Sequence, residues 1–175
     1  TLGVKEILTR PPDLIVSGIN KGANLGEDVH YSGTVSAAVE GGIMGIPSIA
    51  LSLMGRDHYN FSGAAQFAVR LAKKVLKEGL PPGVILNVNI PNLFLKQIKG
   101  HQFTKQGKRN YGDIIAERID PRGKKYYWIG GDQFDFENIS GSDCNALLAN
   151  YISITPIKVN ITDHEFLDTL RKWKL

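Results

Sequence analysis

Cysteine is nearly absent from this sequence: the 175 residues include one, Cys144. A single cysteine cannot form an internal disulfide or a zinc site built from cysteines, so a reducing, cytoplasmic compartment is expected. No uninterrupted apolar run approaches the roughly 20 residues that cross a bilayer. Residues 1–9 contain no apolar block typical of a secretory signal. These absences argue against disulfide-stabilised secreted domains, and we expect no membrane partner.

A strong net charge is also lacking. The 21 lysines and arginines exceed the 17 aspartates and glutamates by four, which gives a net charge of +4. This small excess favours anionic ligands such as phosphates, but it is too weak to indicate a nucleic-acid partner. Lys105, Lys108, Arg109 and Tyr111 form a small basic and aromatic cluster. Such a cluster can stack on bases or bind phosphate, although it is more often a solvated loop.

Several familiar catalytic patterns are missing. The four histidines, His30, His58, His101 and His164, are scattered and form no HExxH motif, so a zinc site is not expected. The sequence has no G-x-S-x-G elbow, no Walker Gly-Lys-Ser/Thr and no G-x-G-x-x-G fingerprint. These observations argue against an α/β-hydrolase, a P-loop enzyme and a dinucleotide-binding enzyme.

The sequence does have the composition of a folded domain, with 42% hydrophobic residues and 19 glycines. Three short apolar runs predict buried strands, and two helical patterns lie between them. The strands are expected at 13–17, 47–53 and 84–90, and the helices at 32–44 and 62–78. Near-continuous apolar strands that alternate with helices are typical of an α/β fold whose parallel sheet is covered on both faces.

The last third of the chain has a different pattern. Residues 114–119 and 124–129 predict a hairpin around a turn at 120–123, and residues 151–155 predict a further strand. A hairpin of this length is marginal alone, so it is expected to pack on another subunit. Thr162 and Glu165 have the spacing of a capping box and predict a closing helix. Its apolar face would carry Phe166, Leu170 and Trp173.

A glycine-rich segment, SGINKGANLGEDVHYSGT at 17–34, follows the first predicted strand. Loops at the carboxyl end of a parallel strand are where open α/β sheets bind their ligands. Asn20 and Asn24 offer amide oxygens that can bind a hard cation or hold a water molecule. The segment therefore predicts a ligand-binding loop, although glycines in loops most often only form turns.

The same segment ends in Ser32, Gly33 and Thr34, at the predicted start of a helix. Helix N-termini expose unpaired N–H groups and the positive end of the dipole, which suit a phosphate. The two hydroxyls add donors, and glycine leaves room for close approach. The simpler interpretation is a helix N-cap.

Nine blocks of the sequence resemble the SurE (survival protein E) family. They are PDLIVSGIN at 12–20, GANLG at 22–26, YSGTV at 31–35, AAVEG at 37–41, GIPSIA at 45–50, LNVNIP at 86–91, DPRG at 120–123, YWIG at 127–130 and SITP at 153–156. They cover essentially the whole chain.

The resemblance implies a Rossmann-like three-layer α/β sandwich with a mostly parallel sheet, an extended β-hairpin and a C-terminal exchange segment. It implies one SurE-like domain over residues 1–175. Residues 1–100 would form the Rossmann-like part, and residues 101–175 the hairpin and the C-terminal oligomerisation part. A homodimer or homotetramer is expected.

The resemblance also implies a phosphatase that depends on a divalent metal, Mg²⁺ or Mn²⁺. Its substrates would be nucleoside 5′- and 3′-monophosphates, with polyphosphate a further substrate of some members. Asn20 matches the metal-ligand asparagine of the family. Ser32, Gly33 and Thr34 match its phosphate-holding segment, and Asn24 belongs to the same pocket. Asn20, Ser32 and Thr34 are the expected catalytic residues.

One family feature is missing. The metal-ligating Asp-Asp-Gly of the family has no counterpart here, because no Asp-Asp pair occurs in the sequence. The N-terminal βαβ portion that carries it is therefore expected to be absent from this chain. One neutral amide cannot hold a hard dication alone. A non-catalytic phosphate- or nucleotide-binding module is the alternative function, and a nucleic-acid-binding domain is a less favoured third.

Overall fold

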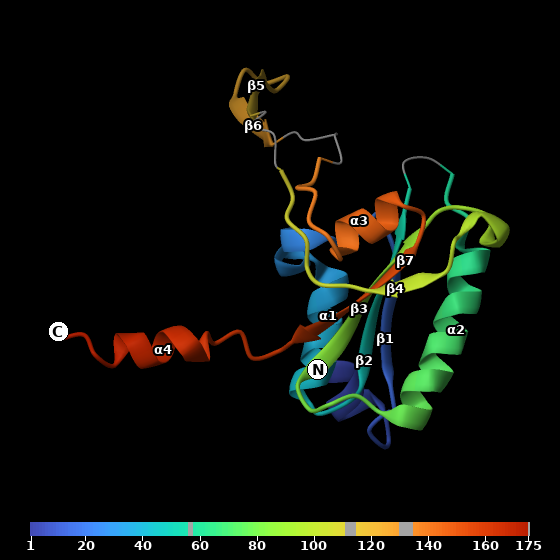
Figure 1. Cartoon of the computed structure of the whole chain (residues 1–175). Helices are drawn as coiled ribbons and strands as arrows, with labels where there is room; N and C mark the ends of the chain where they lie inside the picture. Colours follow the sequence, from blue (N-terminus) through green and yellow to red (C-terminus); the bar gives the residue numbers. More distant parts are fainter. Residues whose placement is uncertain (56–57, 111–114, 130–134, 175) are drawn as a thin grey trace.

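The computed structural model describes residues 1–55, 58–110, 115–129 and 135–174. Its body is built on a five-stranded sheet in the order β1-β2-β3-β7-β4 (Figure 1). β1, β2 and β3 are parallel, whereas β7 is antiparallel to β3 and β4 is parallel to β7. The strands are β1 (Ile15–Lys21), β2 (Ser48–Met54), β3 (Val84–Pro91), β4 (His101–Phe103) and β7 (Ile152–Lys158). The predicted α/β fold with three parallel strands is confirmed.

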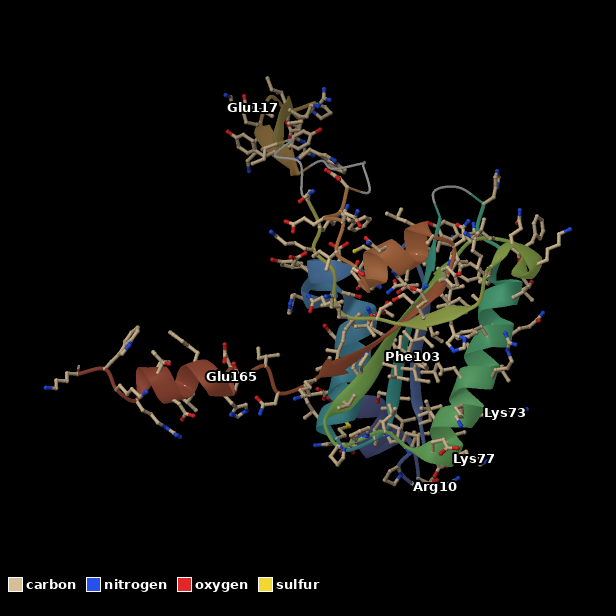
Figure 2. The ribbon with its side chains drawn as sticks, viewed as in Figure 1. Arg10, Lys73, Lys77, Phe103, Glu117 and Glu165 are labelled. Atoms are coloured by element: carbon tan, nitrogen blue, oxygen red, sulfur yellow. The ribbon has the colours of Figure 1, made fainter. Side chains whose placement is uncertain are left out.

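Two helices cover opposite faces of this sheet (Figure 1). α2 (Phe61–Glu78) is amphipathic and packs Ala64, Phe67 and Val75 on apolar residues of β2, β3 and β7. α1 (Gly33–Ile43) packs Val35 and Ala38 on the other face. Figure 2 shows Lys73 and Lys77 pointing outward from α2, as the helical pattern predicts. The helix predictions at 32–44 and 62–78 are confirmed to within one residue at each end.

The packing of α1 on the sheet requires glycine at two of its positions. A Cβ on Gly41 would overlap Ser48 Oγ and lie 2.7 Å from Ile15 Cδ1. A Cβ on Gly42 would lie 2.8 Å from Ile85 Cγ2. The two glycines therefore allow α1 to pack directly against side chains of β1, β2 and β3.

The face opposite α2 carries a buried layer of polar side chains at alternate positions of three strands. We call this set the polar layer: Ser52, Asn87, Asn89, Ser153 and Thr155. Thr104 reaches it from beyond β4, with its hydroxyl 2.9 Å from Ser153 Oγ and 2.7 Å from Thr155 Oγ1. Buried polar groups are costly unless they are hydrogen-bonded, so this layer needs partners in the chain that covers it.

Two parts project from the body (Figure 1). One is the hairpin of β5 (Ile115–Ile119) and β6 (Lys125–Ile129), and the other is α4 (His164–Leu170) with the C-terminus beyond it. The predicted hairpin is confirmed, although residue 114 lies outside the described residues. Its turn is held by Asp120, whose Oδ1 accepts hydrogen bonds from the N–H groups of Arg122 and Lys124. Figure 2 shows Glu117 and Glu165 on these parts, well apart from the sheet.

The predicted start of the closing helix was wrong by one residue. Asp163 caps α4, because its Oδ1 accepts the N–H of Phe166 at 2.9 Å. Thr162 lies before the cap and donates its own N–H to Asn160 Oδ1. Aspartate is a better N-cap than threonine, so Asp163 takes the cap in place of the capping box that the Thr162–Glu165 spacing predicts.

Several elements had no clear sequence signal. They are α3 (Asp143–Leu148), β4 and the short helical turns η1 (Gly3–Ile7), η2 (Gly26–Tyr31) and η3 (Leu95–Gln97). Each is six residues or fewer, too short for a hydrophobic period to show. α3, β4 and β7 come from residues 101–175 but belong to the same body as residues 1–100. Within the part of the chain that the structure describes, no helix is long and apolar enough to span a membrane.

Candidate functional site

The candidate site begins at the carboxyl end of β1, where the strand has an irregular register. Ser17 pairs with Ala50 and Asn20 with Ser52, so β1 has one residue more than β2 between these pairs. Gly18 lies there with φ of +117°, and a Cβ would overlap the carbonyl oxygen of Leu51. Only glycine fits this position. The irregularity places Asn20 inside the strand, one residue before its end, rather than in the following loop.

Asn20 is half-buried and uses its amide nitrogen locally. Its Nδ2 donates to the carbonyl oxygen of Gly22 at 3.0 Å. Among the described residues no donor reaches its Oδ1. The side chain therefore presents one neutral oxygen at the edge of the sheet where ligands of α/β folds bind.

Asn24 fastens the loop after β1 onto the polar layer. Its N–H donates to Asn89 Oδ1 at 2.8 Å, and its carbonyl oxygen accepts from Asn87 Nδ2 and Asn89 Nδ2, each at 2.9 Å. Its own Nδ2 donates to Ser52 Oγ at 2.6 Å. With 7% of its surface exposed, Asn24 lies against β2 and β3, where its groups hold the loop in place.

Ser32, Gly33 and Thr34 form the start of α1, as the sequence indicates. Ser32 is the N-cap, and its Oγ accepts the N–H of Val35 at 3.1 Å. Gly33 is exposed, and a Cβ built on it would meet nothing within 4 Å. Thr34 is half-buried in the first turn. The first N–H groups of a helix have no partner inside it, so Gly33 and Thr34 offer donors beside open space.

The segment between these residues, η2, is tied to the base of the projecting hairpin. The backbone N–H of Arg109 donates to Glu27 Oε2 at 2.8 Å, and Arg109 Nη1 forms an ion pair with Asp28 Oδ2 at 2.7 Å. Lys108 pairs with Glu137. The basic cluster predicted at 105–111 is thus partly neutralised, and its member Tyr111 lies outside the described residues.

The N–H of Arg109 holds the pKa of Glu27 below its ordinary value of 4.5, against an opposing effect of burial. A lowered folded-state pKa means that this contact stabilises the fold above pH 4.5, the unfolded value, and that the stabilisation is lost as pH falls through the folded value. We expect Glu27→Gln to cost about 1 kcal/mol at pH 7, and less below pH 4.5. Urea denaturation of the wild type and the variant at pH 7 and at pH 3.5 measures this difference in stability.

The matched control for Glu27 is Glu78→Gln. Glu78 pairs with Lys74 on the exposed side of α2, in an i,i+4 ion pair of 3.0 Å. Such exposed pairs contribute little to stability. A loss in Glu27→Gln that is equal at pH 7 and at pH 3.5 would contradict the assigned role of the carboxylate.

The described residues do not by themselves form a metal centre. They contain no group of three or more histidine, cysteine, aspartate or glutamate side chains able to hold a metal ion. The Oδ1 of Asn20 is the kind of oxygen that Mg²⁺ accepts, but it is neutral and single. A divalent cation at this edge would need carboxylate ligands besides those that this part of the chain supplies.

A large cavity lies away from these residues. It is a groove of about 880 Å³ on the α2 face, lined mainly by apolar side chains such as Phe67, Leu71, Phe103 and Ile154. Its polar lining residues include Arg70, Lys74 and His101. A mainly apolar groove suits an apolar ligand, whereas the polar groups expected to bind a phosphate or a cation lie at the edge near Asn20.

Comparisons with known proteins identify the family of the chain. Residues 1–113 match the family described as "Survival protein SurE". The "5'-nucleotidase SurE" of Symbiobacterium thermophilum is 50% identical over 174 residues, which are 99% of this chain and 68% of the relative. The "5'-nucleotidase SurE" of Geotalea uraniireducens is 49% identical over 99% of this chain and 71% of the relative. The crystal structure of the SurE protein from Aquifex aeolicus superposes with a TM-score of 0.85 at 47% identity, and covers 97% of this chain and 69% of that one.

Proposed function

The chain belongs to the SurE family, and from this membership we propose that it is a phosphatase that hydrolyses nucleoside 5′-monophosphates to nucleoside and phosphate. Nucleoside 3′-monophosphates and polyphosphate are included as further substrates. The observation that carries the proposal is the open first turn of α1 at Gly33 and Thr34, next to the segment that follows Asn20.

In this proposal the start of α1 binds the phosphoryl group. The N–H groups of Gly33 and Thr34 donate to its oxygens, and the Thr34 hydroxyl adds a third donor. The positive end of the helix dipole stabilises the anion. Ser32 acts indirectly, because its hydroxyl is engaged as the N-cap and fixes the direction of the first turn. Donors that are fixed before the reaction stabilise the charge of the transition state most effectively.

Asn20 is assigned as one ligand of a magnesium or manganese ion. Support comes from its available Oδ1 and from its place at the carboxyl end of β1. The described residues contain no group of three or more histidine, cysteine, aspartate or glutamate side chains able to hold an ion, so the ion is proposed only together with further ligands. Asn24 is assigned to hold the phosphate-binding loop on the polar layer.

The projecting parts are proposed to build a homodimer or homotetramer. Large apolar side chains on both of them face solvent, among them Tyr127, Trp128, Phe166 and Trp173. Exposed apolar surface of this kind is typical of contacts between subunits. Residues 101–175 would then contribute β4, α3 and β7 to the body and the hairpin and C-terminal segment to the assembly. A cytoplasmic location is proposed from the single, buried and unpaired Cys144.

A second candidate is a module that binds phosphate or nucleotide without hydrolysis. The observation that favours it is the lack of a carboxylate cluster around Asn20 in the described part of the chain. Such a module would keep the anion site at the start of α1. It would bind nucleotide equally well with and without a chelator.

The experiment that separates the two is phosphate release from a panel of nucleoside monophosphates, with Mn²⁺ or Mg²⁺ and with EDTA. Metal-dependent release that is lost in Asn20→Ala supports the phosphatase. Nucleotide binding without release, unaffected by EDTA, supports the binding module. If the folded chain neither releases phosphate nor binds nucleotide, both functions are contradicted.

A further inference from the structure

Asp143 is the most completely buried carboxylate that the structure describes, and no role has so far been given to it. It is the first residue of α3 and has 0% of its surface exposed. We propose that Asp143 is a positioning residue, which fixes the phosphate-binding segment by holding the backbone at Gly26. This inference rests on the proposed phosphate site at the start of α1.

The carboxylate joins three separate parts of the chain through their backbone. Oδ2 accepts the N–H of Gly26 at 3.1 Å. Oδ1 accepts the N–H groups of Gly107 and Cys144, each at 2.8 Å. The thiol of Cys144 also donates to Oδ1 at 3.3 Å. Hydrogen bonds to a charged acceptor are about twice as strong as neutral ones, so this arrangement holds its donors firmly.

The geometry around Asp143 leaves no room for larger residues. A Cβ on Gly107 would lie 2.6 Å from Cys144 Sγ and 2.7 Å from Asp143 Oδ1. Gly26 has φ of +52°, and its Cβ would lie 3.1 Å from the carbonyl oxygen of Gly107. Gln106 completes the contact, because its Nε2 donates to the carbonyl oxygen of Gly26 at 3.0 Å. Both polar groups of the Gly26 backbone are therefore fixed by side chains 80 and 117 residues further along the chain.

The bond from Gly26 to Oδ2 is not needed to begin α3, although Oδ1 also accepts the N–H of Cys144 in the first turn. The N-cap of α3 is Ser142, whose Oγ accepts the N–H of Asn145 at 3.1 Å. Asp143 instead directs one carboxylate oxygen out of the helix toward Gly26. Gly26 begins η2, and η2 ends at Tyr31, directly before the N-cap Ser32. Asn24 on one side and Gly26 on the other thus set the path along which the chain reaches α1.

Asp143→Asn tests the role with little change in shape. The amide oxygen can replace Oδ1 and keep the bonds from Gly107 and Cys144, but the amide nitrogen then faces the N–H of Gly26, donor against donor. The Gly26 end of the segment is expected to be released. Displacement of a binding group by about 1 Å can cost about 100-fold in rate. We expect the KM for nucleoside monophosphate to rise at least about tenfold, with a smaller change in kcat.

Ser142→Ala is the matched control, since it removes only the hydroxyl that caps the same helix. That hydroxyl bonds to Asn145 and not to Gly26 or Gly107, and alanine keeps the Cβ that lies beside Gly107. Ser142→Ala is expected to lower the Tm about as much as Asp143→Asn does, without a change in KM. Two further measurements on both variants and the wild type are the affinity for inorganic phosphate and the hydrogen exchange of the Gly26 amide. Weaker phosphate binding and faster Gly26 exchange in Asp143→Asn alone support the positioning role.

The outcomes separate this inference from the proposed function. Equal changes in KM, phosphate affinity and Gly26 exchange in the two variants would overturn the positioning role, because loss of α3 stability would then explain them. A wild-type chain that binds phosphate but hydrolyses nothing would contradict the phosphatase. The phosphate affinities would still test Asp143. A wild-type chain that binds no phosphate would overturn both.

Discussion

Asn20→Ala is expected to lower nucleoside monophosphate hydrolysis at least about 100-fold while the chain stays folded. Among the residues that the structure describes, the side chain makes one hydrogen bond, from Nδ2 to the carbonyl oxygen of Gly22, so its removal should cost only about 1 kcal/mol of stability. Its Oδ1 is the oxygen that we assign to the metal. Steady-state kinetics with Mn²⁺, together with a thermal melt, measures both effects.

Asn20→Asp distinguishes the role of the side-chain oxygen from that of the Nδ2 donor. The aspartate keeps an oxygen in the place of Oδ1 and loses the donor to Gly22. If Asn20 acts as a ligand, Asn20→Asp should retain metal-dependent activity that Asn20→Ala lacks. If the aspartate and alanine variants are equally inactive, the bond to Gly22 is the essential one, and the ligand role is contradicted.

Gly33→Val is expected to reduce kcat/KM about 100-fold without unfolding the protein. A Cβ on Gly33 meets no atom within 4 Å, so the fold has room for a larger residue there. That space is where the proposal places the phosphoryl oxygens, and a branched side chain would fill it and cover the first N–H groups of α1. The loss of donors to a charged transition state has effects of this size in other enzymes, roughly 100- to 1,000-fold.

The control for Gly33 is Ala37→Val, which places the same side chain one turn further along the exposed side of α1. In a helix valine is better than glycine and worse than alanine, each by roughly 0.5 kcal/mol, which is small beside the expected effect on kcat/KM. Inorganic phosphate should inhibit the wild type and Ala37→Val alike, and Gly33→Val much less. Normal activity of Gly33→Val would rule out a phosphate at the start of α1.

The sequence predicted most of the body because its signals there are local. The apolar runs at 47–53 and 84–90 correspond closely to β2 and β3, and the apolar period of 62–78 to α2. Ser32 before a helix of small residues identified the N-cap. The first strand was located less well: it runs to Lys21, because Gly18 continues β1 through an irregular register rather than ending it.

The contacts that organise the candidate site could not be predicted from local sequence patterns, because they join residues far apart in the sequence. Asp143 lies 117 residues from Gly26 along the chain, and Asn89 lies 65 residues from Asn24. No spacing rule brings such residues together, since their meeting depends on the sheet order and on where α3 packs. One signal was available: Asn87 and Asn89 alternate with apolar residues inside an otherwise apolar strand. Paired asparagines at such positions indicate a buried polar contact on one face.

The polar layer also protects the chain against folding into the wrong pairing. Side chains of a strand alternate between its faces, so a slip of β3 by one residue would turn Asn87 and Asn89 toward the apolar surface under α2 and bring Val88 to the polar side. Each stranded amide would then cost roughly 1 to 3 kcal/mol. The hydrogen bonds to Asn24 thus favour the correct register of β3. In a misaligned sheet the loop after β1 could not form these bonds, so the wrong register would be less stable even without a ligand.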